Sequence, residues 1–196
     1  MIWFTSDTHL GHANAIGFTN RPFDNIEAMN RTLIANINAC VQARDELYIL
    51  GDFSFRIPAE DAARLRGKIR CRNVHLVPGN HDKDWSQPDV AGTFVVEPPI
   101  KVLKAEGRKF VLSHYPIMDW QSMRHGSIHL HGHIHAVGGA YNQANRARGL
   151  LRYDVGVDAN GMMPVSMAQA LQWFEGVDPC GRPEWEDLVG GEEQAG

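Results

Sequence analysis

Five apolar runs in this chain of 196 residues each end in side chains of the kinds that bind metal ions. In the central run, Val74–Asp82, an apolar strand reaches Pro78-Gly79 and is followed by an amide, an imidazole and a carboxylate. Because proline and glycine end a strand ladder, Asn80, His81 and Asp82 fall in a tight loop past the strand's carboxyl end. The other four runs end in Asp7-Thr8-His9, Gly51-Asp52, His114 and His133-Ile134-His135. In open α/β sheets ligands bind at the carboxyl ends of the strands, so the five runs predict one shared site.

Each of these stretches has an ordinary explanation when it is taken alone. Asn-His-Asp after Pro-Gly is typical of a turn, and a single histidine is often a hydrogen-bonded core residue. Seven donors at the ends of separate strands favour a metal site instead. In an extended segment, Asp7 and His9 lie on one face, as do His133 and His135, so each pair can share an ion.

The types of the donors narrow the choice of metal. Imidazole together with carboxylate disfavours calcium, which takes oxygen ligands, and a structural zinc site would be closed by thiolates. Seven donors exceed what one catalytic ion with an open position needs, which favours two ions sharing one carboxylate. We therefore expect two divalent transition-metal ions, manganese first, with iron, nickel, zinc or cobalt as alternatives and magnesium as a poorer fit.

The spacing of apolar residues predicts a change of architecture half-way along the chain. The first half has β-α-β-α-β spacing, which is typical of parallel strands with helices over the faces of the sheet. Its expected elements are strand Ile2–Thr5, helix Ile26–Val41, strand Glu46–Leu50, helix Ala59–Leu65 and strand Asn73–Val77. The second half is strand-rich and predicts a second sheet. Its expected strands are Phe94–Glu97, Ile100–Leu103, Lys109–Ser113, Ser127–Leu130 and Tyr153–Val157, with a loop at Val137–Gly149 and a helix capped by Ser166 that runs to Phe174.

The composition is that of one globular domain with a polar tail. Hydrophobic residues make up 43% and charged residues 21%, and we expect a domain at 1–175 and an acidic, flexible tail at 176–196. The net charge of −4 offers no extended surface for nucleic acid. A strand begins directly after Met1, and no apolar run approaches the ~20 residues of a membrane span, so no membrane partner and a cytoplasmic location are expected.

The five blocks, in this order, resemble the signature blocks of the calcineurin-like metallophosphoesterase superfamily. The sequence around these blocks is similar to that of a small group of uncharacterised bacterial and phage phosphoesterases. The stretches that carry this similarity are Gly11-His12, Arg21-Pro22-Phe23, Met29-Asn30 and Val155-Gly156-Val157-Asp158. The resemblance implies an α/β fold with two packed mixed β-sheets flanked by helices, a four-layer α/β/β/α sandwich. It also implies a ligand set: Asp7, His9 and His135 for the first ion, Asn80, His114 and His133 for the second, and Asp52 as the bridge between them.

The same resemblance implies hydrolysis of a phosphomonoester or phosphodiester, by in-line attack of a hydroxide that bridges the ions. His81, next to Asn80, is the candidate general acid; the alternative is that it chiefly stabilises charge. The family's protein serine/threonine phosphatases carry a second aspartate three residues after the bridging one, whereas this chain has Phe55 there. Protein phosphatase activity is therefore not expected, and Asp82 is the remaining candidate to fix the tautomer of His81.

Contacts to the substrate are expected from the loop after the first block. The candidates are His12, Asn14 and Arg21, since a guanidinium binds phosphate in a bidentate way. The alternative for Arg21 is a salt bridge at the start of the following helix. His75, His125, His129 and His131 are expected to be structural, and Trp85, Met118, Trp120 and Tyr141 either wall a pocket or pack.

The class of ester stays open among a monoester, a diester, a cyclic nucleotide and a dinucleoside polyphosphate. The expected partner is a small phosphate ester or nucleotide, and the oligomeric state is not predicted. Two other functions are compatible with the same residues: a catalytically silent scaffold that binds metal for stability, and a metal-dependent nuclease subunit. The complete set of metal donors disfavours the scaffold function. The negative net charge and the small size of the chain disfavour the nuclease function.

Overall fold

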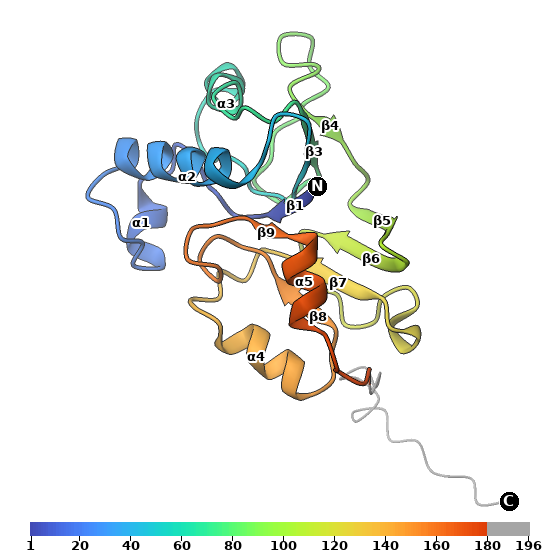
Figure 1. The fold of residues 1–196 in the computed structure, drawn as a ribbon. Coiled ribbons are helices and arrows are strands. Elements are labelled where there is room, and N and C mark those ends of the chain that lie inside the picture. Colours follow the sequence, from blue (N-terminus) through green and yellow to red (C-terminus); the bar gives the residue numbers. More distant parts are fainter. Residues whose placement is uncertain (180–196) are drawn as a thin grey trace, which may run out of the picture.

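Two β-sheets pack face to face at the centre of the molecule, with helices on their outer sides (Figure 1). This computed structural model describes residues 1–179. The first sheet has the order β4-β3-β2-β1-β9 and the second β5-β6-β7-β8. The strands are β1 (Ile2–Thr5), β2 (Glu46–Ile49), β3 (Asn73–Leu76), β4 (Val95–Val96), β5 (Ile100–Ala105), β6 (Arg108–Ser113), β7 (Ile128–His131), β8 (Arg152–Asp154) and β9 (Val165–Ser166). Each sheet contains parallel and antiparallel pairs, which confirms the predicted fold of two mixed sheets flanked by helices.

The first half of the chain folds as its apolar spacing predicts, apart from one short helix, α1, that was not expected. β1, β2 and β3 are parallel neighbours, and the helices between them are α1 (Asn14–Phe18), α2 (Ile26–Cys40) and α3 (Ala59–Arg66). Helix α2 begins where Asn25 accepts a hydrogen bond from the amide of Ala28. Its buried stripe, which includes Met29, Leu33 and Ile37, shares one hydrophobic core with residues of β2 and β3. A second core, which includes side chains of β1, β6 and β7, fills the space between the sheets.

The second half departs from the prediction in three ways. Strand β4 pairs with β3 in the first sheet, although the run Phe94–Glu97 was expected in the second. Strand β9 closes the other edge of the first sheet, antiparallel to β1. The predicted loop Val137–Gly149 is wrong in its middle, where α4 (Ala140–Ala147) forms. The last helix, α5 (Met167–Trp173), is capped by Ser166 as predicted.

Helix α4 was missed because its buried face is polar. Asn142 and Asn145 are buried, and neither would be assigned to a core from its type. Asn142 exchanges two hydrogen bonds with the backbone of Asp154 in β8, one in each direction, at 3.0 and 2.7 Å. Asn145 accepts a hydrogen bond from Arg152. Hydrogen bonding to an open strand edge therefore replaces the apolar stripe that would have marked the helix in the sequence.

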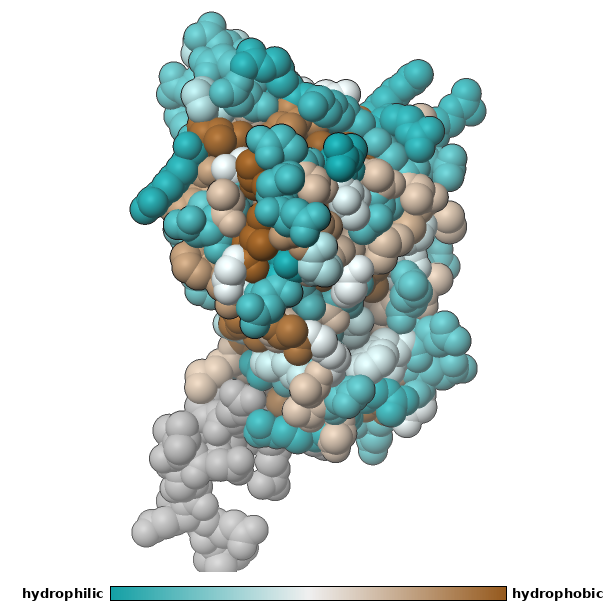
Figure 2. All heavy atoms as spheres, turned by 90° about the vertical axis from the view of Figure 1, so that its left-hand side faces the viewer, coloured by the Kyte–Doolittle hydropathy of each residue, from teal (hydrophilic) through white to brown (hydrophobic). Residues whose placement is uncertain are grey.

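The outer surface carries both hydrophilic and apolar groups. Figure 2 shows the side of the molecule that carries α1, on which apolar side chains form a broken band among hydrophilic ones. Within residues 1–179, each helix is too short or too polar to cross a lipid bilayer. The predicted tail at 176–196 lies almost entirely outside the described residues.

Candidate metal centre

The loops that follow five strands converge at the edge where the two sheets meet. Asp7 and His9 follow β1, Asp52 follows β2, Asn80 follows β3, His114 follows β6, and His133 and His135 follow β7. Hydrogen bonds join these loops. The amide of Asp7 donates to the carbonyl of Gly51 within the first sheet, and the amide of His133, from the second sheet, donates to Oδ2 of Asp7. Residues more than a hundred positions apart thereby share one site.

Two glycines permit this close approach. A Cβ at position 79 would collide with the carboxylate and backbone of Asp52, and one at position 132 would collide with the side chains of Ser6 and Asp7. Only a residue without a side chain fits at Gly79 and Gly132, so both glycines are structural requirements of the site.

The backbone is strained at most of the donor positions. Five of the seven donors have left-handed backbone angles, with φ of 57° at Asp7, 47° at His9, 55° at Asp52, 72° at His133 and 48° at His135. This conformation is uncommon for residues other than glycine and is found preferentially at functional sites, where surrounding structure holds it in place.

Three donors form a first group. Ligand atoms of Asp7, His9 and His135 all lie within 4.8 Å of one another. Nε2 of His9 lies 3.1 Å from Nε2 of His135, and Oδ1 of Asp7 lies 3.8 Å from Nε2 of His135. Spacings of 3 to 4 Å are those of atoms that surround one metal ion at about 2 Å.

Three donors form a second group around His114. Its Nδ1 lies 2.9 Å from the carbonyl oxygen of Leu50, which can only accept, so Nδ1 carries the proton. The opposite nitrogen, Nε2, then carries a lone pair, and it lies 2.9 Å from Oδ1 of Asn80 and 3.2 Å from Nδ1 of His133. In this orientation of the amide, the lone pair of His114 and the carbonyl oxygen of Asn80 lie close enough to be ligands of one cation.

Asp52 connects the two groups through one oxygen. Oδ2 of Asp52 lies 3.5 Å from Nε2 of His9 and 3.6 Å from Nε2 of His114. The other oxygen, Oδ1, accepts a hydrogen bond of 2.9 Å from the amide of His81, which fixes the orientation of the carboxylate. Oδ2 therefore points to both groups.

Burial and charge in the site suit divalent cations. Burial raises the pKa of Asp7, whereas burial and the neighbouring His135 lower the pKa of His9 to about 2. The imidazole of His9 is thus neutral and keeps the lone pair that a metal ion requires. Oδ1 of Asp7 is buried and has no hydrogen-bond partner among the described residues, an unfavourable state that a cation would relieve. The residues therefore fit bound metal ions.

Asp158 supports the first group from behind, a role that sequence reasoning missed. Its Oδ2 accepts a hydrogen bond of 2.8 Å from Nδ1 of His135, which leaves Nε2 of that ring for a metal. Burial opposes ionisation of Asp158, but hydrogen bonds from His135 and Arg21 outweigh it and lower the pKa. The same contact and the charge of Asp7 raise the pKa of His135 despite its burial. The signal in the sequence was the apolar run before Asp158, which repeats the pattern of the other blocks.

Comparison with known proteins places the chain among related sequences. Residues 1–154 match the sequence model of the calcineurin-like phosphoesterases. The chain belongs to this family. It is 36% identical to an uncharacterized protein of Methanocaldococcus jannaschii over 135 residues, which are 69% of each chain. It is 26% identical to the gene 66 protein of Mycobacterium phage L5 over 167 residues, covering 68% of this chain and 77% of that one.

A solved structure also matches this calcineurin-like phosphoesterase. A protein of unknown function from Aquifex aeolicus aligns with a TM-score of 0.70 at 24% identity, over 88% of this chain and 98% of that one. At this level of identity the likeness concerns the fold alone. The match of residues 1–154 to the family's sequence model confirms the resemblance inferred from the five blocks.

Arg21 of this phosphoesterase does not lie where a contact to the substrate phosphate was predicted. Its guanidinium is buried, and Nε and Nη2 donate to the two carboxylate oxygens of Asp158, each at 2.8 Å. The remaining hydrogen bonds go to the carbonyl oxygens of Thr8 and Asp7 and to Sδ of Met29, so all five N–H groups are engaged. A guanidinium engaged in this way has no donor left for a phosphate, so the predicted substrate contact is wrong. Arg21 instead holds the loop after β1 against Asp158.

Asp82, which was predicted to orient His81, makes no hydrogen bond to its ring. The carboxylate of Asp82 accepts hydrogen bonds from the amides of Asp52, Phe53 and Gly79; it shapes the loop, and the idea that it orients His81 is wrong. The exposed ring of His81 instead packs against Phe55, with ring centroids 4.2 Å apart.

The two remaining substrate candidates lie in different places. Asn14 is exposed at the start of α1 and lines a hollow that contains no metal donor. His12 lines the same cavity as His81.

Two further histidines are structural, as expected. His129 and His131 are fully buried, and burial lowers the pKa of both, that of His129 to about 4. Each has a partner on both ring nitrogens, including the amide of Ile117 for His129 and the hydroxyl of Tyr141 for His131. Trp85 and Trp120 are buried in the cores and do not wall the site.

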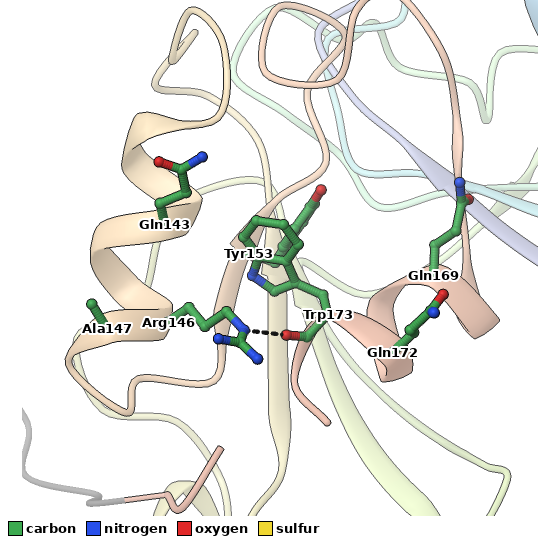
Figure 3. Close-up of a pocket in the computed structure, with 7 residues that line it drawn as sticks. All are labelled: Gln143, Arg146, Ala147, Tyr153, Gln169, Gln172 and Trp173. Atoms are coloured by element: carbon green, nitrogen blue, oxygen red, sulfur yellow. Dashed lines mark hydrogen bonds between the residues drawn. The ribbon is translucent and has the colours of Figure 1, made fainter. Parts of the chain in front are cut away.

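A larger hollow lies away from the metal centre. It has a volume of about 640 Å³ and lies between α4, β8 and α5, with Tyr153 and Trp173 at its centre (Figure 3). Arg146 closes one side by donating a hydrogen bond to the carbonyl oxygen of Trp173. None of the described residues that line this hollow is a metal donor, so it plays no part in the metal centre.

Proposed function

We propose that this calcineurin-like phosphoesterase is a hydrolase with two divalent metal ions, acting on small phosphomonoesters or phosphodiesters. The observation that carries the proposal is the position of Oδ2 of Asp52 between His9 and His114. A carboxylate oxygen that faces two donor groups is the arrangement of a dinuclear site.

The donors divide between the two ions in the proposed enzyme. Asp7, His9 and His135 hold the first ion, and Asn80, His114 and His133 hold the second. Two such ions supply positive charge that polarises a phosphate and favours the ionisation of an attacking water. Manganese is proposed because imidazole and carboxylate ligands suit it and the set lacks thiolates.

His81 is the proposed general acid. Its amide is fixed by Asp52, and its exposed ring lies 5.7 Å from that of His9, between centroids. In this place the ring reaches the edge of the donor groups without belonging to either. It can give a proton to the leaving oxygen of the ester, whose departure is otherwise slow.

The experiment that tests the proposal uses the purified protein, stripped with a chelator and reloaded with manganese. We expect two ions per chain and hydrolysis of at least one of 4-nitrophenyl phosphate and bis(4-nitrophenyl) phosphate. Asp52→Asn should lower the metal content and abolish turnover. His81→Ala should keep both ions and lose rate by about 10²-fold or more.

Matched controls are available on the same chain. Asp119 and His125 are exposed and lie outside both donor groups, so Asp119→Asn and His125→Ala should retain metal content and rate. If the loaded wild type binds two ions but hydrolyses neither class of ester, the scaffold function replaces the proposed one.

A further inference from the structure

A cavity opens directly beside the proposed general acid. It has a volume of about 380 Å³, and His81 and His135 form part of its wall. Phe18, Ile134 and Val137 line it as well, and these apolar side chains are exposed by 76%, 37% and 67%. The volume is in the range of pockets that bind small molecules. Exposed apolar groups beside a reaction centre are ready to bury part of a ligand.

Three rings that line this cavity, those of Phe18, His12 and His81, belong to one row of ring contacts, in which Phe55 joins His12 to His81 from outside the lining. The ring of Phe18 lies 5.9 Å from that of His12, which lies 4.5 Å from that of Phe55, which in turn lies 4.2 Å from that of His81, measured between centroids. The segments after β1, β2 and β3 contribute to this row, and Phe18 is the last residue of α1. A row of ring edges and faces suits a flat aromatic ligand, which gains from tilted and edge-to-face contacts beyond its buried area.

The lining carries no fixed charge. None of the described residues that line the cavity is a lysine, arginine, aspartate or glutamate. Arg21 is withdrawn to Asp158, and Arg56 lies over the ring of Phe55, 5.0 Å from its centroid, without lining the cavity. A site for a second phosphate group or an acidic peptide would need such a cation.

We propose that this cavity receives the leaving group of the ester and selects a flat, uncharged aromatic group, either an aryl ring or the base of a nucleoside. The inference rests on the proposed function, because a leaving oxygen at His81 directs the rest of its group into the cavity. Phe18, Ile134 and Val137 are then the residues that determine specificity. In this proposal the metal donors and His81 carry out the reaction, and apolar contacts with the cavity recognise the leaving group.

The experiment compares esters that differ in their aromatic part, by its size in one pair and by its presence in the other. One pair is 2-naphthyl and phenyl phosphate; the other is adenosine 5′-phosphate and ribose 5-phosphate, each also as its methyl diester. With the manganese-loaded protein, we expect about a tenfold higher kcat/KM for the larger member, mainly through KM. The pair that shows the higher kcat/KM identifies whether the leaving group is an aryl alcohol or a nucleoside.

Substitutions in the cavity decide whether it causes the preference. Phe18→Ser and Val137→Ser should reduce the preference to less than about threefold. Val95→Ser and Ile100→Ser are matched controls, since these side chains are exposed by 53% and 55% on β4 and β5, and they should leave it unchanged. Equal kcat/KM within both pairs, or a preference that survives both cavity substitutions, would overturn the proposal.

A binding measurement separates this proposal from the proposed hydrolysis. The non-hydrolysable 2-naphthyl and phenyl phosphonates are titrated into the metal-loaded protein, and we expect the same preference, dependent on Phe18. If no ester is hydrolysed, the hydrolase function fails while the titration still decides the role of the cavity. Val137→Lys adds a positive test, because a cation there should create a preference for 4-carboxyphenyl phosphate over phenyl phosphate.

Discussion

Asp158→Asn tests how far the metal centre depends on a residue that touches no metal. The carboxylate accepts four hydrogen bonds, from Thr19, from Nε and Nη2 of Arg21 and from Nδ1 of His135, each at 2.8 Å. Asparagine has the same shape but only one acceptor oxygen. Whichever way the amide is turned, its NH₂ group faces a donor.

The effect on His135 can be worked out from the tautomer. If the NH₂ group faces Nδ1, the ring relieves the clash by moving its proton to Nε2, the nitrogen that points to Asp7 and His9. A protonated Nε2 cannot bind a metal. Loss of such a supporting contact lowers metal affinity by about 10- to 100-fold. The buried guanidinium of Arg21 also loses its counter-charge, which lowers the free energy of unfolding by about 3 kcal/mol or more.

The assay is calorimetric titration of the stripped protein with manganese, together with urea unfolding. For Asp158→Asn we expect one of the two sites to weaken and the other, around His114, to keep its affinity. Asp45→Asn is the matched control: Asp45 is also buried and accepts hydrogen bonds from Met1, Trp3 and Gln42, but it lies outside both donor groups. It should destabilise the fold without changing metal affinity. If both variants bind manganese like the wild type, the reasoning about His135 is refuted.

Three further predictions concern packing, pH and metal removal. Gly79→Ala places a Cβ against the carboxylate of Asp52 and should abolish tight metal binding and destabilise the fold by about 1–3 kcal/mol; calorimetry that finds two normal sites would contradict this. Burial lowers the pKa of His129 to about 4 from 6.5, so the unfolded chain takes up this proton first, and stability should fall by about 3 kcal/mol as pH drops from 6.5 to 4. Urea unfolding at several pH values checks this, and His129→Gln should flatten the dependence. Manganese at a hundred times its Kd should raise the unfolding free energy of the stripped protein by about 2.7 kcal/mol for each site that it fills, and Asp52→Asn should remove most of that gain.

The sequence was sufficient for features that depend on the local chain. The helix at α2 follows from its apolar stripe and its Asn25 cap, and the parallel order of β1, β2 and β3 follows from the alternation of strands and helices. The donors could be proposed because parallel strands present their carboxyl ends at one edge, which is a property of the fold class rather than of any one residue.

Features that depend on contacts between residues far apart in the chain could not be predicted from the sequence. Strand β4 has two residues, and nothing in Val95-Val96 says which sheet it joins. Arg21 has the residue type of a phosphate ligand, and only its burial against Asp158, 137 positions away, gives it another role. The left-handed backbone at Asp7 and Asp52 is likewise imposed by the surrounding structure, since neither residue type requires it.

The division of donors between the sheets links the proposed chemistry to the architecture. Asp7, His9, Asp52 and Asn80 follow strands of the first sheet, whereas His114, His133 and His135 follow strands of the second. Each proposed ion therefore takes ligands from both sheets and acts as a cross-link at their common edge. The strained backbone at five of these donors is unfavourable in itself, so it requires the packed core between the sheets to persist, and bound ions would reinforce it. It follows that loosening the sandwich far from the site, for example in the core between the sheets, should weaken metal binding even where no donor is changed.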